Sequence, residues 1–167
     1  MSTETMEKTL IERALAAAKS AYAPYSHYHV GAALLTEEGQ IFTGCNIENA
    51  TYGATNCAER TAFFKAVSEG HRSFRMIAVV GGPAEQILTE GVPEAKKEPS
   101  AVEMMGTEKA AVDNSDYTGQ FSDYAYPCGI CRQVMKEFCG EDFVILVAKS
   151  AEDYKRFTLG ELLPHAF

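Results

Sequence analysis

Residues 75–82, RMIAVVGG, form a short and almost entirely apolar run. A second run of the same kind, FVILVAK, covers residues 143–149. Runs of this length without polar alternation are typical of strands that are buried on both faces of a sheet. Each run follows a segment with helical features, 57–69 and 128–138. This alternation of helix and buried strand predicts an α/β layered sandwich.

The segments outside these strands predict three further units. Residues 7–22 place apolar side chains at helical spacing, and Pro24 predicts the end of that helix. HVGAALL (29–35) and IFTGCNI (41–47) flank the turn TEEGQ, which predicts a β-hairpin. RFTLGELLPHAF (156–167) predicts a short edge strand and a single helical turn. The aromatic residues at positions 63, 64 and 138 are expected to face the core.

The length and charge of the chain exclude several classes of protein. At 167 residues the chain suits a single domain, 1–167. Its net charge of −8 disfavours binding to a nucleic-acid backbone or to an anionic membrane. No apolar run reaches the roughly 18 residues of a membrane-spanning helix. We therefore expect neither a nucleic acid nor a membrane as a partner.

Residues 82–126 interrupt the alternation of helices and strands. They show no sustained periodicity and contain nine acidic residues against three basic ones, which is −6 of the net charge of −8. A loop of this length is uncommon inside a compact domain. The change in composition at Gly81, Gly82 and Pro83 favours an acidic surface insertion at about 82–126.

The chain has five cysteines, an odd number for a disulfide framework. A chain of this size folds without disulfides, so the thiols fit a reducing compartment and a role in metal binding or catalysis. The N-terminal stretch MSTETMEKTL lacks the basic and apolar regions of a secretory signal. These features predict a cytoplasmic location. Cys45 and Cys139 are interpreted as core thiols.

Two short motifs contain the other cysteines, and each motif is ambiguous alone. In CAERTAFFKAV (57–67), Glu59 could form a capping box with Asn56, and Cys57 could be a small buried residue. In PCGIC (127–131), the CxxC pair could be a redox dithiol, half of a structural zinc site, or two thiols on one helical turn.

Taken together, the two motifs fit a catalytic zinc site. Three thiolates leave one tetrahedral position open, which a catalytic site needs and a structural site lacks. Both motifs begin helices, where free amides and the helix dipole stabilise thiolates. Glu59 could reach a water in the open position, and Arg60 could offset the negative charge of three thiolates.

CAE followed by PCxxC is a form of the zinc-deaminase signature, and the chain resembles the homotetrameric cytidine deaminases that act on free nucleosides. The matching stretches include AYAPYSHYHVGAALL, FTGCNIENATYG and TLGELLPHAF, and together they cover nearly everything except 82–126. The resemblance implies a three-layer α/β/α sandwich with a mixed five-stranded sheet. It also implies hydrolytic deamination of cytidine and 2′-deoxycytidine in pyrimidine salvage, one Zn²⁺ per subunit, and a homotetramer.

The resemblance implies roles for residues at the reacting end of the substrate. Cys57, Cys128 and Cys131 correspond to the zinc ligands, and Glu59 corresponds to the proton shuttle. The backbone of Ala58 corresponds to the group that reads the edge of the base. If these roles hold, residues 82–126 are expected to lie outside the pocket mouth and the subunit interfaces.

The resemblance also implies residues that hold the rest of the substrate. Asn46 and Glu48 correspond to the pair that binds the sugar hydroxyls, and two residues that are two apart on a strand end project to the same side. Tyr28 occupies the position where the family usually stacks a phenylalanine under the pyrimidine. Tyr52 and Phe167 correspond to positions that reach into a neighbouring subunit's site.

Four alternatives remain at this stage. The enzyme could deaminate another aminopyrimidine nucleoside, such as a nucleoside antibiotic. A deaminase that edits RNA or DNA is disfavoured by the acidic charge. From a different class, the chain could be a structural-zinc interaction module with Cys139 as the fourth ligand, or a thiol redox protein that uses Cys128 and Cys131.

Overall fold

The computed structural model of the protein describes residues 2–87 and 120–167. In this part of the chain, none of the helices combines the length and the apolar character needed to cross a membrane. The elements along the chain are α1 (Thr3–Ala18), β1 (Tyr28–Thr36), β2 (Ile41–Cys45), the 3₁₀ turn η1 (Tyr52–Ala54), α2 (Ala58–Ser68), β3 (Phe74–Pro83), the 3₁₀ turn η2 (Ala84–Gln86), α3 (Gly129–Phe138), β4 (Val144–Ala148), β5 (Tyr154–Thr158) and α4 (Leu159–Leu162).

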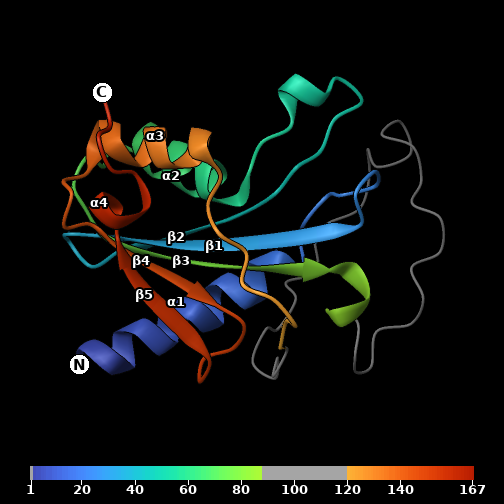
Figure 1. Ribbon diagram of the computed structural model, residues 1–167, viewed down its shortest axis with the longest axis horizontal. Coiled ribbons are helices and arrows are strands. Elements are labelled where there is room, and N and C mark those ends of the chain that lie inside the picture. Colours follow the sequence, from blue (N-terminus) through green and yellow to red (C-terminus); the bar gives the residue numbers. More distant parts are fainter. Residues whose placement is uncertain (1, 88–119) are drawn as a thin grey trace.

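The described residues form a three-layer sandwich around a mixed five-stranded sheet with the strand order β2-β1-β3-β4-β5 (Figure 1). β3 and β4 are parallel, and the other neighbouring strands are antiparallel. Helix α1 covers one face of the sheet, and α2 and α3 cover the other (Figure 1). The predicted fold class is confirmed.

Strand β3 shows why the central strands read as continuous apolar runs. Met76, Ala78 and Val80 pack in the core on the α1 side of the sheet. Ile77 and Val79 pack in the core on the opposite side, against α2 and α3. Because both faces are covered, neither set of alternating positions can be polar.

The first helix has different ends from those predicted. Instead of covering 7–22, it begins next to Ser2, whose side chain caps it by accepting a backbone N–H. It ends at Ala18. The backbone N–H of Tyr22 donates to the carbonyl of Asn46 at 3.0 Å, so this residue already pairs with the chain that follows β2. Apolar spacing alone could not show that this pairing ends the helix.

The predicted insertion at 82–126 is too wide at both ends. Ile87 and Phe121 are buried in the core on the α1 side of the sheet. Phe121 lies so close to Gly82 that a Cβ on this glycine would be 2.3 Å from the ring. Both residues are isolated apolar positions in an acidic stretch, so no periodicity indicated their burial. Residues 88–119 lie outside the described residues.

One of the three aromatic residues expected in the core is exposed. Phe63 is fully buried, and Phe138 is partly buried against the same core. Phe64 has 47% of its surface exposed. Adjacent residues of a helix point in directions about 100° apart, so residues 63 and 64 cannot both occupy the centre of the buried face.

Candidate active site

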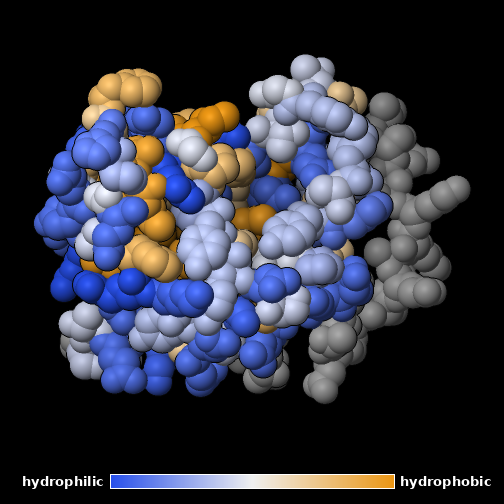
Figure 2. Space-filling view, viewed as in Figure 1, coloured by the Kyte–Doolittle hydropathy of each residue, from blue (hydrophilic) through white to orange (hydrophobic). Residues whose placement is uncertain are grey.

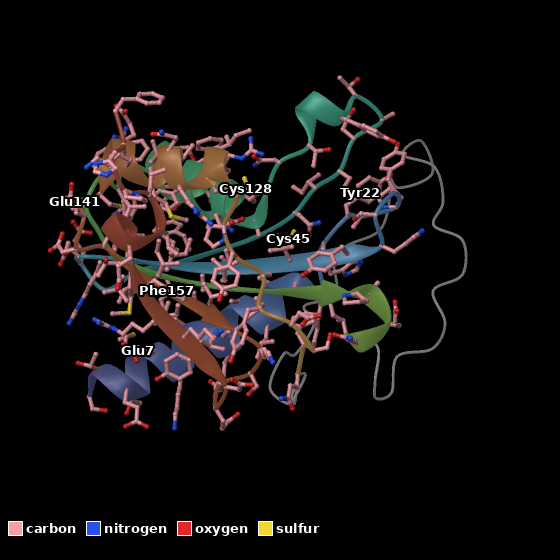
Figure 3. All side chains as sticks on the ribbon, in the orientation of Figure 1. Glu7, Tyr22, Cys45, Cys128, Glu141 and Phe157 are labelled. Atoms are coloured by element: carbon pink, nitrogen blue, oxygen red, sulfur yellow. The ribbon has the colours of Figure 1, made fainter. Side chains whose placement is uncertain are left out.

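Three thiols from two helix starts meet at the end of the sheet. Cys57 is the N-cap residue of α2. Cys128, which Figure 3 labels, is the N-cap residue of α3. Cys131 lies in the first turn of α3. The sulfur atoms of Cys57 and Cys128 are 3.9 Å apart, and those of Cys128 and Cys131 are 3.5 Å apart. Residues that are 71 positions apart in the sequence therefore form one cluster.

The three thiols fit a tetrahedral zinc ion. Zn–S bonds of about 2.3 Å place neighbouring sulfurs about 3.8 Å apart, close to the observed distances. Among the described residues, the cluster of possible metal ligands at this place consists of Cys57, Cys128 and Cys131. Neither Cys45 nor Cys139 joins it. Cys139 packs against the core, where burial and Asp142 raise its pKa to about 12. Three protein ligands leave a fourth position open.

The surroundings of Cys57 stabilise its thiolate. The pKa of Cys57 is lowered to about 5, chiefly by the hydrogen bond from Cys131 and also by Arg60, while burial opposes the change. The pKa of Cys131 is raised by the same hydrogen bond and by burial. Without a metal, the Cys131 thiol therefore keeps its proton, and its hydrogen bond stabilises the thiolate of Cys57.

Arg60 lies beside the cluster, where the sequence analysis expected it. Its Nη2 is 3.5 Å from the sulfur of Cys57 and donates to the carbonyl of Thr55 at 3.1 Å. Among the described residues, its buried Nε has no hydrogen-bond partner. The guanidinium is thus fixed next to the thiolate and can offset its negative charge.

Glu59 is a buried carboxyl group next to the thiols. Only 4% of its surface is exposed. Burial, with a smaller effect of the Cys57 charge, raises its pKa to about 7. The capping-box interpretation is wrong, because the N-cap residue of α2 is Cys57 and the backbone N–H of Asn56 donates to the carbonyl of Ile47 at 2.9 Å. Glu59 is therefore free to exchange protons near neutral pH.

Two of the thiols, Cys57 and Cys128, line a hollow of about 340 Å³ together with Glu59. The surface in Figure 2 is hollowed near the place where Figure 3 labels Cys128. Residues from β1, β3, the start of α2 and the segment before α3 line it: Tyr28, Val30, Asn46, Thr55, Asn56, Cys57, Glu59, Val79, Tyr124, Ala125, Tyr126 and Cys128. This volume suits a small molecule.

Asn46 lines the hollow and also fixes the start of β1. Its Oδ1 accepts the backbone N–H of Val30 at 2.8 Å, and its Nδ2 donates to the carbonyl of Tyr28 at 2.8 Å. The side chain thereby pairs with β1 beyond the end of β2. Its orientation in the hollow is set by the backbone of the neighbouring strand.

Glu48 lines a second hollow, of about 420 Å³. Its Oε2 accepts the backbone N–H groups of Tyr25 at 2.9 Å and Ser26 at 3.2 Å. That Asn46 and Glu48 project to the same side stays a prediction: β2 ends at Cys45, but Ile47 between them still forms β-bridges with Tyr22 and Asn56. The two residues line different hollows. Thr55 lines both hollows, so the two are adjacent.

Comparison with known proteins places this site in a family. Residues 4–147 match the family model described as the cytidine and deoxycytidylate deaminase zinc-binding region. The chain belongs to this family. It is 41% identical to a cytidine deaminase of Sporosarcina psychrophila, with 95% of this chain and 88% of the relative covered. It is 40% identical to a cytidine deaminase of Halalkalibacterium halodurans, with 95% and 91% covered.

A solved structure agrees with the sequence relatives. The crystal structure of cytidine deaminase from Burkholderia pseudomallei matches with a TM-score of 0.70 at 37% identity, and the match covers 100% of both chains. The three-thiol cluster therefore lies in a deaminase of the zinc-binding family, and its geometry fits the zinc ion that this family binds.

The remaining residues expected at this deaminase site occupy different environments. Tyr28 lines the hollow, and burial and Asp123 raise its pKa. Ala58 is fully buried as the first residue of α2, so its N–H has no acceptor within the helix. Tyr52 is 77% exposed and Phe167 is 102% exposed. Within the described chain, the deaminase hollow is lined by neither of these two aromatic residues.

The sequence analysis missed the segment before α3 as part of the deaminase hollow. Tyr124, Ala125 and Tyr126 line it, although 82–126 was expected to lie outside the pocket mouth. The expectation was wrong because the chain returns to the sheet before it enters α3. The aromatic cluster FSDYAY, directly before PCGIC, was the available sign of this return.

Proposed function

We propose that the protein catalyses the hydrolytic deamination of cytidine and 2′-deoxycytidine to uridine and 2′-deoxyuridine, with release of ammonia, in cytoplasmic pyrimidine salvage. The observation that supports this most strongly is a cluster of three thiols beside a buried carboxyl group, next to a hollow of about 340 Å³ that Cys57, Cys128 and Glu59 line. Relatives named cytidine deaminase, at 41% and 40% identity over 95% of the chain, support the same substrate.

Cys57, Cys128 and Cys131 would hold one zinc ion per subunit. When bound, zinc supplies a water that ionises near neutral pH and can attack C4 of the pyrimidine. Arg60, 3.5 Å from the sulfur of Cys57, offsets part of the negative charge of three thiolates. Three thiolates would otherwise make the zinc-bound water less acidic, and the positive charge of Arg60 counteracts this effect.

Glu59 would transfer the protons. Its pKa of about 7 means that it takes up and releases a proton near neutral pH. It accepts a proton from the attacking water and donates it to N3 of the ring. It then accepts the proton of the hydroxyl on C4 of the hydrated base and donates it to the amine, which leaves as ammonia while the C4 carbonyl forms. These transfers favour the hydrated, non-aromatic form of the base over flat cytidine, which is what lowers the barrier.

Asn46, Glu48 and Tyr28 would hold the nucleoside. An amide nitrogen carries two hydrogens, so Nδ2 of Asn46 can donate to a sugar hydroxyl as well as to Tyr28. Glu48 can reach the sugar from the adjacent hollow, which shares Thr55 with the first. Tyr28 would stack on the base, and Ala58 would contact the edge of the base through its backbone.

The protein would act as a homotetramer with composite sites. Phe167 and Tyr52 are 102% and 77% exposed, and the outward-facing Phe64 and Ile130 are 47% and 63% exposed. Large apolar side chains at these exposures favour burial against another chain. Tyr52 and Phe167 would then complete the site of a neighbouring subunit.

The direct test is turnover of cytidine by the purified protein, followed by the loss of its ultraviolet absorbance and by release of ammonia. We expect efficient turnover of cytidine and 2′-deoxycytidine, and very slow turnover of free cytosine, which lacks the sugar. Faster turnover of another aminopyrimidine nucleoside would replace the proposed substrate. A zinc-bound protein that turns over none of these compounds would contradict the proposal.

A further inference from the structure

The segment of residues 121–126 lies directly on the sheet before it enters α3. A Cβ on Gly81 would be 2.9 Å from the Cβ of Ala125, and a Cβ on Gly82 would be 2.3 Å from the ring of Phe121. Both distances are shorter than real contacts allow, so the segment occupies the space that two side chains of β3 would fill. The pair of glycines is what brings this segment into the hollow.

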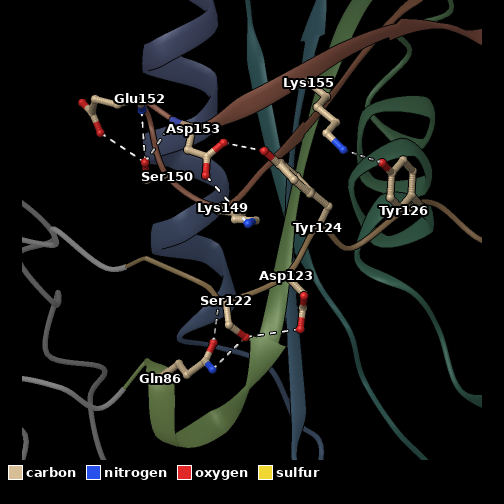
Figure 4. A network of polar contacts seen from close by, with 10 residues as sticks. All are labelled: Gln86, Ser122, Asp123, Tyr124, Tyr126, Lys149, Ser150, Glu152, Asp153 and Lys155. Carbon is tan, nitrogen blue, oxygen red and sulfur yellow. Dashed lines mark hydrogen bonds and ion pairs between the residues drawn. The ribbon is translucent and has the colours of Figure 1, made fainter.

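The β4–β5 hairpin fixes Tyr124 and Tyr126 from the other side (Figure 4). The hydroxyl of Tyr124 donates to Asp153. Two lysine ammonium groups lie against the Tyr124 ring, that of Lys155 at 4.2 Å and that of Lys149 at 4.5 Å from its centroid. Lys155 also donates to the hydroxyl of Tyr126 at 3.5 Å. These contacts limit the movement of both rings.

The beginning of the segment is held as well (Figure 4). The side chain of Gln86 donates to Oγ of Ser122 and accepts the backbone N–H of Ser122, both at 3.0 Å. The backbone N–H of Phe121 donates to the carbonyl of Lys149 at 3.0 Å. Residues 121–126 therefore form a wall that is anchored at both ends, and we call them the tyrosine wall.

The chemistry of the proposed reaction orients the base against this wall. C4 of the pyrimidine must lie at the thiols, and N3 must face Glu59 to receive its proton. Because C4 lies between N3 and C5, the C5 edge then faces away from Glu59 and α2. The tyrosine wall lines the same hollow next to the thiols, since only Pro127 separates Tyr126 from Cys128.

We propose that Tyr126, supported by Tyr124, contacts the C5 edge of the pyrimidine and sets the size of the C5 substituent that the enzyme accepts. This inference rests on the proposed function. An anchored wall cannot retreat to admit a larger group. A single methyl group in a pocket of this kind changes catalytic efficiency by roughly 10- to 200-fold.

The test compares kcat/KM for cytidine and for 5-methylcytidine. In the wild type, we expect efficiency on 5-methylcytidine to be lower by about 10-fold or more. Tyr126→Ala should raise the ratio of 5-methylcytidine to cytidine efficiency by about 10-fold, and Asp153→Asn, which loosens Tyr124, should raise it less. Tyr22→Ala is the matched control, because Tyr22 is 47% exposed, close to the 45% of Tyr126, and lies outside the hollow's lining.

Binding of the two products gives a readout that does not depend on turnover. Calorimetry should show that Tyr126→Ala gains affinity for 5-methyluridine relative to uridine, while Tyr22→Ala does not. If the wild type fails to deaminate cytidine, the proposed function is wrong. If the wild type deaminates cytidine but Tyr126→Ala changes both substrates and both products equally, the C5 contact is wrong. If Tyr126→Ala unfolds, the test passes to Tyr126→Leu and Asp153→Asn. These variants must then raise both the ratio of 5-methylcytidine to cytidine efficiency and the ratio of 5-methyluridine to uridine affinity, or the inference fails.

Discussion

The thiol end of the site, formed by Cys57, Cys128, Cys131 and Glu59, differs sharply from the sugar end formed around Glu48. At the thiol end, Cys131 is 1% exposed and Glu59 is 4% exposed. At the sugar end, Glu48 is only half-buried, and Tyr52, which lines the same hollow, is 77% exposed. One chain thus buries Glu59 and one of the three thiols, but leaves Cys128 exposed and the sugar end more open.

The difference follows from which elements build each end. Two helix starts that pack on the sheet position the thiols, so the core that stabilises the fold also fixes the metal ligands. Glu48 and Tyr52 lie instead on the loop between β2 and α2. A loop that projects from the sheet needs another surface to become enclosed, and we propose that a neighbouring subunit supplies it.

The largest effect is expected from a substitution at the thiol end. Glu59→Gln keeps the size of the side chain but removes the proton carrier, so turnover of cytidine should fall by at least ~10²–10⁴-fold while zinc stays bound. Turnover and zinc content measured on the same sample separate the two effects. Glu161→Gln is the matched control, since Glu161 forms a true capping box with Thr158 at the start of α4 and should leave turnover near that of the wild type. Near-normal turnover of Glu59→Gln would show that Glu59, like Glu161, is not the proton carrier.

A smaller effect is expected where the two ends meet. Asn46→Ala removes hydrogen bonds to Val30 and Tyr28 as well as a sugar contact, so it should lower both the free energy of unfolding, by ~1–3 kcal/mol, and the catalytic efficiency. Glu48→Ala should lower catalytic efficiency with less effect on stability, because its side chain is only half-buried whereas that of Asn46 is buried. Thermal unfolding and kcat/KM for cytidine check both variants. Equal loss of stability in the two would show that Glu48 is also part of the framework.

Deletion of Phe167 tests whether the open end is completed by another chain. We expect weaker assembly and lower turnover of cytidine, with zinc content unchanged, because the deleted ring is fully exposed in the single chain. Light scattering and the activity assay measure the two effects. A protein that is monomeric before the deletion, or that is unaffected by it, would contradict a composite site.

The smallest effect is expected from residues 88–119. The Gln86–Ser122 pair holds the two flanks together, so a short glycine-serine linker between positions 87 and 120 should close without distorting the site. Loop closure changes by only about 0.6 kcal/mol for each doubling of length. Zinc content, assembly and turnover should all stay close to wild type. Loss of assembly would show that this stretch belongs to an interface.

The sequence predicted the thiol end well for a physical reason. Cysteines at helix starts have few alternative geometries, so their spacing and the following carboxylate predicted a cluster that the structure confirms. The buried strands were equally clear, because covered faces require apolar residues at every position. Both features depend on local pattern and on general rules of packing.

The errors concern residues whose position depends on contacts between distant segments. Tyr124 and Tyr126 enter the hollow because their segment lies on Gly81 and Gly82, which no periodicity reveals. Asn46 and Glu48 line different, adjacent hollows, and the chain that contains them is positioned by β-bridges of Ile47 to Tyr22 and Asn56. Such outcomes follow from tertiary pairing, and local sequence rules do not determine them.

The coordination of zinc in the purified protein tests the central claim most directly. Elemental analysis and X-ray absorption at the zinc edge should show one zinc per chain, with three sulfur ligands and one lighter ligand. Four sulfur ligands would mean that Cys45 or Cys139 closes the site, which would make the zinc structural. Absence of zinc from an active enzyme would contradict the account altogether.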